Sequence, residues 1–370
     1  MTEAAPHRLL LGGSKLSVVG RARIYVCGVT PYDVTHLGHA ATFVWVDAAD
    51  RLLRRLGVQV EVCRNVTDVD DVLFDAASRV GAQYDRFAAV QQFHFDHDMD
   101  ALAVRRPAHE PRAHSHVPQV VELAGALLDA GVAYSSGGSV YMRGAQVVER
   151  AGLDRQQALA ALAGNGGHLD DPDKDDPLDQ AVWQSSTDDE PAWPSPWGPG
   201  RPGWHAECTA MALSTYGSSL DLHAGGVDLR FPHHAFETAQ AEAATGVAPF
   251  ARAWLHVGTV QLDGQKMAKS TGNLVFVSDL IARTSGAVVR TLLLDRRYDM
   301  PWDYTQAGLD AAGARLDDLH RAAGRPHTDA VAQQEVLSAL SHDLDVPRAL
   351  DIAVEDGGQA ARDLATVLAL

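Results

Sequence analysis

The sequence predicts an α/β protein, in which a parallel-sheet domain carries an inserted subdomain and is followed by a C-terminal helical bundle. Three observations predict this class. A strand, a helix and a second strand follow one another within residues 23–66. A proline-rich stretch interrupts the regular pattern at 164–202, and the pattern after about residue 285 is helical to the end of the chain.

The first strand is "RIYVCGV", residues 23–29, and a helix is predicted over 40–57, where apolar residues recur at 43, 46, 49, 53 and 56. "VQVEVCRNV", residues 58–66, alternates as a second strand. The three elements predict a βαβ unit, hence parallel strands with a right-handed crossover. Thr67 and Asp70 in "TDVDD" resemble a capping box that opens the next helix.

The middle of the chain reads as an insertion. Residues 85–131 are predicted to be helical, and 132–143 to form a hairpin. Residues 164–202 hold seven of the 17 prolines, a composition that favours neither a helix nor a central strand. A helix at 203–217, a strand and turn at 220–226 and a helix from 232 then resume the sheet domain. We expect four parts: 1–90 and 203–285 as the two halves of the catalytic domain, 91–202 as the inserted subdomain, and 286–370 as the bundle.

Composition sets the class of protein. The 370 residues are 46% hydrophobic and 21% charged, which is typical of a globular protein. The net charge of −17 argues against a non-specific nucleic-acid binder. No apolar run approaches the length of a membrane span, and the first residues lack the features of a signal peptide. Three cysteines, an odd and sparse number, suit a reducing cytoplasm, where we expect the protein to act.

A set of metal-binding side chains is spread over three segments. Cys27 lies at the carboxyl end of the first strand, where ligand sites of parallel sheets are found. Cys208 follows "WHAE" on a predicted helix, and His233 and Glu237 are spaced to share one helix face. Thiolate, imidazole and carboxylate are the ligands that zinc prefers. Taken alone, the same residues also fit a buried cysteine and a solvated helix face.

Two further segments have the chemistry to hold a nucleotide, although no GxxxxGK[ST] or GxGxxG motif occurs. "THLGHA", residues 35–40, precedes a helix whose N–H groups suit phosphate, and His36 and His39 can stabilise charge on phosphate oxygens. Lys266 and Lys269 in "DGQKMAKSTGN" suit a flexible clamp on pyrophosphate. Each segment alone also fits an ordinary exposed loop.

Taken together, "THLGHA", "KMAKS", "WHAEC" and "PHHAFE" resemble the signatures of the class I aminoacyl-tRNA synthetases. Within that superfamily the chain is similar to the cysteinyl-tRNA synthetase family, which includes a relative that ligates cysteine to an amino sugar. The resemblance spans about residues 20–305 and includes "NVTDVDD", "DPLD", "GRPGWHAEC" and "GGVDLRFPHH". It implies a Rossmann-like catalytic domain with HIGH-type and KMSKS-type loops.

The resemblance also implies how cysteine is selected. In that family one zinc ion is held by residues that match Cys27, Cys208, His233 and, in the tRNA enzyme, Glu237. The thiolate of the substrate cysteine joins these ligands. Because zinc favours a thiolate over a hydroxyl group, serine is rejected without an editing site.

The remaining site residues are carried over by matching position. ATP, with Mg²⁺, would be activated by His36, His39, Lys266 and Lys269. The cysteinyl adenylate would contact Gly28, Val29, Thr30, Thr42, Asn65, Val66 and Thr67, with Trp204 as a wall of the cysteine pocket. Adenosine would contact Gly226, Val227, Asp228 and Val260. His205, His234, His256 and Cys63 are expected to be structural.

The acceptor of the cysteine is less closely defined. Only residues 309–370 follow "MPWDYTQAG", and they contain no basic stripe, which favours a small acceptor over tRNA. We therefore expect a monomer that joins L-cysteine to the amine of glucosaminyl-inositol, a step of mycothiol synthesis. Two departures leave an alternative open: a truncated cysteinyl-tRNA synthetase, or a paralogue that transfers cysteine to tRNA or to another amine in a natural-product pathway. Glu237 matches the tRNA enzyme, and the ligase motif before "DPLD" is echoed only at Asp171 and Pro172. A non-catalytic sensor of cysteine or its adenylate is the alternative from another class.

Overall fold

A four-stranded parallel sheet lies at the centre of the protein. The computed structural model describes residues 9–32, 34–165, 167–187, 190–267 and 272–370. The strand order is β10-β9-β3-β4, and all neighbours are parallel. The strands are β3 (Arg21–Val29), β4 (Gln59–Val66), β9 (Leu222–Gly226) and β10 (Trp254–Val257). Because the strands are parallel, the ends of β3, β4 and β9 lie along one edge of the sheet, where ligand sites are expected.

Helix α1 (Leu37–Arg55) connects β3 to β4, which confirms the predicted βαβ unit. It packs against the sheet through a fully buried face that includes Leu37, Trp45 and Leu52. The predicted capping box is wrong. Asp70 alone caps α2 (Asp71–Arg79), by accepting from the Val72 N–H, while the hydroxyl group of Thr67 bonds instead to that of Thr30 at 2.7 Å.

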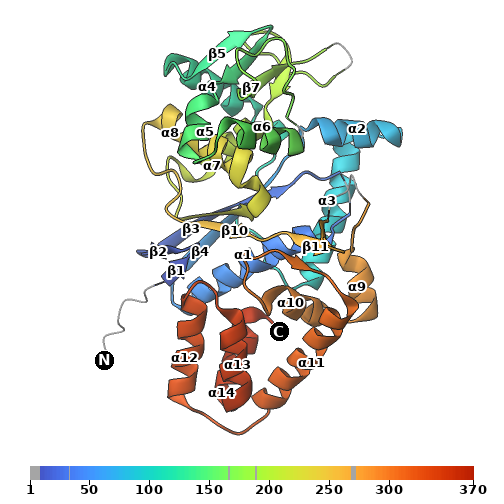
Figure 1. The fold of residues 1–370 in the computed structure, drawn as a ribbon, viewed down its shortest axis with the longest axis vertical. Helices are drawn as coiled ribbons and strands as arrows, with labels where there is room; N and C mark the ends of the chain where they lie inside the picture. Colours follow the sequence, from blue (N-terminus) through green and yellow to red (C-terminus); the bar gives the residue numbers. More distant parts are fainter. Residues whose placement is uncertain (1–8, 33, 166, 188–189, 268–271) are drawn as a thin grey trace.

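The inserted subdomain lies above the sheet in Figure 1 and contains a four-stranded antiparallel sheet, β5-β6-β7-β8. Helix α3 (Tyr84–Ala101) precedes the subdomain and packs on the core of the central sheet through Phe95 and Met99. The strands and helices of the subdomain are η1 (Ala113–Ser115), α4 (Val117–Asp129), β5 (Ala133–Ser136), β6 (Ser139–Met142), α5 (Ala145–Arg150), α6 (Arg155–Gly164), β7 (Gln180–Ser185) and β8 (Gly200–Pro202). The hairpin predicted at 132–143 is confirmed as β5–β6.

Two predictions for this region are wrong. Residues 102–112 are not helical; they run beside β4, where His109 and Arg112 bridge to Cys63 and Val66. Strand β7 lies between β6 and β8, although the composition of 164–202 argued against a central strand. The prolines of this stretch flank β7 and leave its own backbone N–H groups free to pair.

After the inserted subdomain, the chain returns to the parallel sheet and adds the elements around the ends of its strands. The elements are α7 (Trp204–Tyr216), η2 (Val227–Leu229), η3 (Arg230–His234), α8 (Ala235–Thr245), β11 (Val260–Leu262) and β12 (Gln265–Lys266). Segment η3 is not one regular turn: the Phe231 backbone is extended (φ −142°, ψ 132°), and regular α-helix begins with α8. The helix predicted at 203–217 and the strand predicted at 220–226 are therefore confirmed.

The C-terminal helices lie below the sheet in Figure 1 and share its core, because α10 and α14 pack on α1. They are α9 (Val277–Arg283), α10 (Gly286–Leu294), α11 (Gln306–Ala323), α12 (Ala330–Ser341), α13 (Val346–Asp356) and α14 (Gly358–Leu368). Three short strands complete the described elements: β1 (Leu9–Leu11), β2 (Ser14–Leu16) and β13 (Trp302–Asp303). Among the described residues, no helix is both long and apolar enough to cross a bilayer.

Candidate active site

The four predicted metal ligands meet in one buried cluster. Cys27 lies on β3, Cys208 on α7, His233 on η3 and Glu237 on α8. All four side chains are buried, and their ligand atoms lie within 4.8 Å of one another. The Cys27 thiol donates to Glu237 Oε1 at 3.4 Å, and His233 Nε2 lies 3.1 Å from the same oxygen. His233, at the end of η3, and Glu237, in the first turn of α8, are four residues apart and lie on the same side.

For three of the four side chains, interactions inside the cluster outweigh the effect of burial on the pKa. Burial opposes ionisation of Cys208, but a hydrogen bond from Cys27 and the charge of His233 lower its pKa. Burial also opposes a charged His233, but Glu237 and Cys208 raise its pKa to about 10. The pKa of Glu237 lies well below its usual range because His233 and His223 outweigh burial. Burial raises the pKa of Cys27, whose neighbours Cys208 and Glu237 add to the effect.

This donor set fits zinc. Two sulfur atoms, one imidazole nitrogen and one carboxylate oxygen are four ligands of the kinds that zinc takes in tetrahedral sites. The Asn65 side chain supports one of them, since its Nδ2 donates to Cys208 Sγ at 3.2 Å. A charged, buried cluster of this composition is costly to maintain unless its members are paired or bound to a cation.

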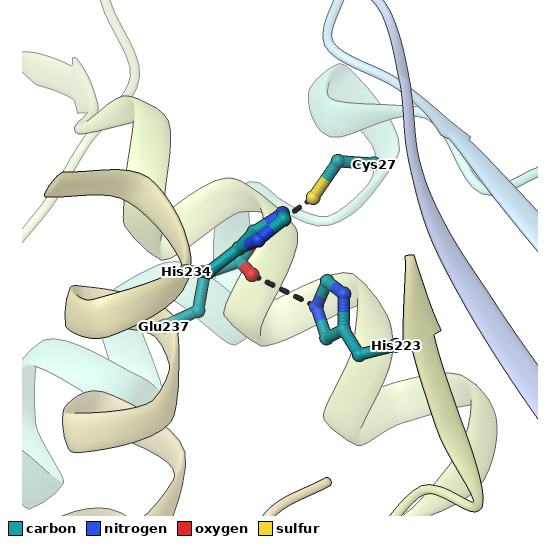
Figure 2. A group of neighbouring side chains, drawn as sticks. All are labelled: Cys27, His223, His234 and Glu237. Atoms are coloured by element: carbon teal, nitrogen blue, oxygen red, sulfur yellow. Dashed lines mark hydrogen bonds and ion pairs between the residues drawn. The ribbon is translucent and has the colours of Figure 1, made fainter. Parts of the chain in front are cut away.

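A second set of four residues also has the spacing of a metal site. Cys27 and Glu237 belong to both sets, and His223 and His234 take the places of Cys208 and His233. Figure 2 shows His223 and Glu237 facing each other across the cluster, with Cys27 on the far side of the carboxylate. Sequence reasoning missed His223. The sequence feature that could have indicated it is its position in the strand "LDLHAGG", directly before the small residues that end β9.

The ends of β3 and β4 are tied together beside the cluster. Gly28, Val29 and Thr30 lie at the end of β3, and Asn65, Val66 and Thr67 lie at the end of β4 or just beyond it. The Gly28 N–H donates to Asn65 Oδ1 at 2.8 Å. A β-carbon at Gly28 would approach the Asn65 carbonyl oxygen to 1.7 Å, so a side chain at this position requires the backbone to move. The predicted adenylate residues of the two strands are thus neighbours.

The predicted wall of the cysteine pocket touches the buried cluster. The Trp204 ring stacks on His233, with ring centroids 4.1 Å apart and an angle of 26° between the planes. His205, expected to be structural, is buried and its Nδ1 lies 2.8 Å from Nδ1 of His233. Both contacts restrict the orientation of the His233 ring.

The histidines of "THLGHA" lie at the first turn of α1. His36 is the N-cap of this helix and accepts from the Gly38 N–H at 3.1 Å. The rings of His36 and His39 are 3.8 Å apart, and His36 is buried whereas His39 is exposed. Thr42 is half-buried one turn further on. The histidine pair therefore lies where a helix N-terminus favours an anion.

Asp228 and Lys266 form an ion pair at 2.6 Å, which joins two of the predicted nucleotide segments. Asp228 lies in η2 beside Gly226 and Val227, and Lys266 ends β12. Val260 is buried in β11 next to Gly38 of the histidine loop. The predicted role of Lys269 falls outside the described residues.

A cavity of about 1230 Å³ opens next to this ion pair. Its lining includes Asp228, Lys266, His234 and His256 on the side of the sheet. Helices α5 and α6 of the inserted subdomain line it as well, among them Arg150 and Gln157. The cavity thus lies between the inserted subdomain and the edge strand β10.

Comparisons with known proteins agree with this architecture. The family described as "tRNA synthetases class I (C) catalytic domain" matches residues 14–314. Two relatives bear the name L-cysteine:1D-myo-inositol 2-amino-2-deoxy-alpha-D-glucopyranoside ligase. The protein from Mycolicibacterium vanbaalenii is 45% identical over 89% of this chain and 79% of its own length. The protein from Parafrankia sp. is 43% identical over 89% of this chain and 75% of its own length.

A solved structure shows the same fold. Methionyl-tRNA synthetase of Mycobacterium tuberculosis, bound by methionyl-adenylate, superimposes with a TM-score of 0.66 over 94% of this chain and 84% of its own. The two sequences are 16% identical, so the likeness concerns the fold alone.

Proposed function

The chain belongs to the class I tRNA synthetase family described by the (C) catalytic domain, and from this premise we propose that it is an ATP-dependent, AMP-forming cysteine ligase. The acceptor that we propose is the amine of glucosaminyl-inositol. The observation that carries the proposal is the likeness to the two named ligases, at 45% and 43% identity over 89% of this chain. The buried cluster of Cys27, Cys208, His233 and Glu237 supports cysteine as the amino acid.

The residues of the cluster would select the amino acid. When bound there, zinc supplies a Lewis acid that prefers a thiolate sulfur to a hydroxyl oxygen. His233 Nε2 lies 3.1 Å from Glu237 Oε1, and Trp204 covers the histidine ring. With the sulfur of cysteine held at this buried cluster, its carboxylate would face the ends of β3 and β4.

The first chemical step would form the adenylate. A carboxylate oxygen of cysteine attacks the α-phosphorus of ATP, and pyrophosphate leaves with the electron pair of the broken P–O bond. His36, His39 and the first turn of α1 stabilise charge on the phosphate oxygens. Lys266, and Lys269 in the same motif, would neutralise the leaving pyrophosphate once Lys266 exchanges Asp228 for phosphate.

The second step would transfer cysteine to the acceptor. The amine nitrogen attacks the carbonyl carbon, the bond to the phosphate oxygen breaks, AMP leaves and the nitrogen gives up a proton. Asp228, released from Lys266, has a free carboxylate for the ribose hydroxyls. The cavity of about 1230 Å³ beside it offers an entrance from solvent large enough for a pseudodisaccharide.

The test offers the metal-loaded chain cysteine, ATP and Mg²⁺ with equal concentrations of glucosaminyl-inositol and tRNA. We expect the amide of glucosaminyl-inositol and one AMP per amide, detected by mass spectrometry and nucleotide analysis. Cysteine on tRNA would establish the tRNA enzyme as the function instead. Absence of AMP and pyrophosphate with every acceptor would contradict an enzyme and favour a sensor.

A further inference from the structure

The two oxygens of Glu237 face different imidazoles. Oε1 lies 3.1 Å from His233 Nε2 and accepts from Cys27, both members of the predicted ligand set. Oε2 lies 2.9 Å from Nε2 of His223, on the opposite side of the carboxylate, as Figure 2 shows. Both side chains of this second pair are at most 1% exposed. Nε2 and Oε2 are close enough for a hydrogen bond, although their alignment is not that of an ideal one.

The backbone and the ring of His223 are both fixed. β9 is an inner strand, and within it His223 lies between Tyr25 of β3 and Trp254 of β10. Its ring stacks on the Trp254 ring, with centroids 4.5 Å apart and an angle of 20° between the planes. No hydrogen bond to its Nδ1 is present among the described residues. Glu237 is thus the polar partner toward which this rigid imidazole is directed.

A single nitrogen cannot both carry a proton toward a carboxylate and bind a metal ion. Contact between His223 Nε2 and an ionised Glu237 requires a proton on this nitrogen. The same contact leaves Oε1 facing the two sulfur atoms and His233. Of the two sets of four residues with metal-site spacing, the His223 contact therefore favours the one that contains Cys208 and His233.

We propose that His223 is a positioning residue, whose Nε2–H holds Oε2 of Glu237 so that Oε1 is presented to a metal ion between Cys27, Cys208 and His233. The inference rests on the proposed function, because it takes the buried cluster to be a metal site. Partners of this kind fix the orientation of a ligand, and their loss typically weakens metal binding by about 10- to 100-fold. Glu237 would then bind through one oxygen only.

The test compares two polar substitutions of the same histidine. Glutamine carries its amide nitrogen about as far from the backbone as Nε2, whereas asparagine is one bond shorter and cannot reach Glu237. The matched control is His234→Asn, since His234 is equally buried, lies 4.7 Å from the His223 ring and bonds to His256 at 2.9 Å instead of to the carboxylate. All variants are loaded with Co²⁺, and metal release to a chromophoric chelator and the visible Co²⁺ spectrum are recorded.

We expect His223→Asn to release Co²⁺ about 10- to 100-fold faster than wild type and to change the Co²⁺ spectrum. His223→Gln should restore both properties to nearly wild-type values, and His234→Asn should leave them unchanged. Equal release from all four proteins would overturn the proposal. Cys208→Ala is measured in the same way. If it keeps the metal while His223→Asn and His234→Asn both lose it, the proposal is also overturned, because that result selects the ligand set with His223 and His234. No amide formation is measured, so a failure of the proposed ligase activity leaves this comparison intact.

Discussion

Among single residues, Cys208 is the most direct test of the proposed metal site. Its sulfur accepts from Asn65 at 3.2 Å and belongs to the cluster with Cys27, His233 and Glu237. We expect Cys208→Ala to leave three ligands and to lower the metal content well below one ion per chain after dialysis against a chelator. Cys63→Ala is the matched control, because Cys63 is equally buried but lies outside the cluster. Equal metal content in the two variants, measured by mass spectrometry, would refute the ligand assignment.

Asp70 gives a pH-dependent prediction at the same scale. Burial, opposed by the hydrogen bond from Val72, raises its pKa from 3.8 to about 6 in the folded protein. The folded state therefore binds more protons than the unfolded state between these values, and the contribution of Asp70 to stability falls as pH rises from about 4 to 6. Asp70→Asn keeps a good N-cap and removes this loss.

We expect Asp70→Asn to have a higher Tm than wild type at pH 7, with the difference shrinking toward pH 4. Thermal unfolding followed by circular dichroism at both pH values measures it. A difference that grows toward pH 4 would show that the carboxylate stabilises the folded chain.

At the scale of elements, the N-cap of α11 gives a prediction about stability. Thr305 caps α11, and its hydroxyl oxygen accepts from the Gly308 N–H at 3.0 Å. Thr305→Ala should lower the free energy of unfolding by about 1 kcal/mol, because the Gly308 N–H loses its acceptor. Thr328→Ala is the control, since Thr328 is exposed and makes no hydrogen bond among the described residues. Denaturant titration that gives the two variants equal stability would contradict the cap.

The elements that sequence predicted best are those with a strong hydrophobic period. β3, α1 and β4 are confirmed because apolar spacing alone distinguishes strand from helix there. Strand β7 was missed because proline content was averaged over a long stretch, whereas its prolines lie outside the strand. The contact of His223 with Glu237 depends on β9 lying beside β3, which local sequence does not encode. For the same reason Thr67 was assigned to a helix cap, although it bonds across strands to Thr30.

The charge of the whole molecule bears on the acceptor. Residues 306–370 contain 11 acidic and five basic side chains, so the bundle repels a polyanion. We expect no saturable binding of tRNA in fluorescence anisotropy at about 150 mM salt, where phosphate contacts are partly screened. A wild-type cysteinyl-tRNA synthetase is the positive control. Saturable binding to this chain would favour the alternative in which tRNA accepts the cysteine.

The fold brings residues from β3, α7, η3 and α8 to one buried point, and we propose that this point selects an amino acid by its sulfur. The most direct measurement is ATP–pyrophosphate exchange with cysteine or serine. We predict that the metal-loaded chain exchanges with cysteine and discriminates against serine by more than the roughly 100-fold that shape alone supplies. Exchange at similar rates with both amino acids, or exchange with cysteine that is unaffected by Cys208→Ala, would contradict the claim.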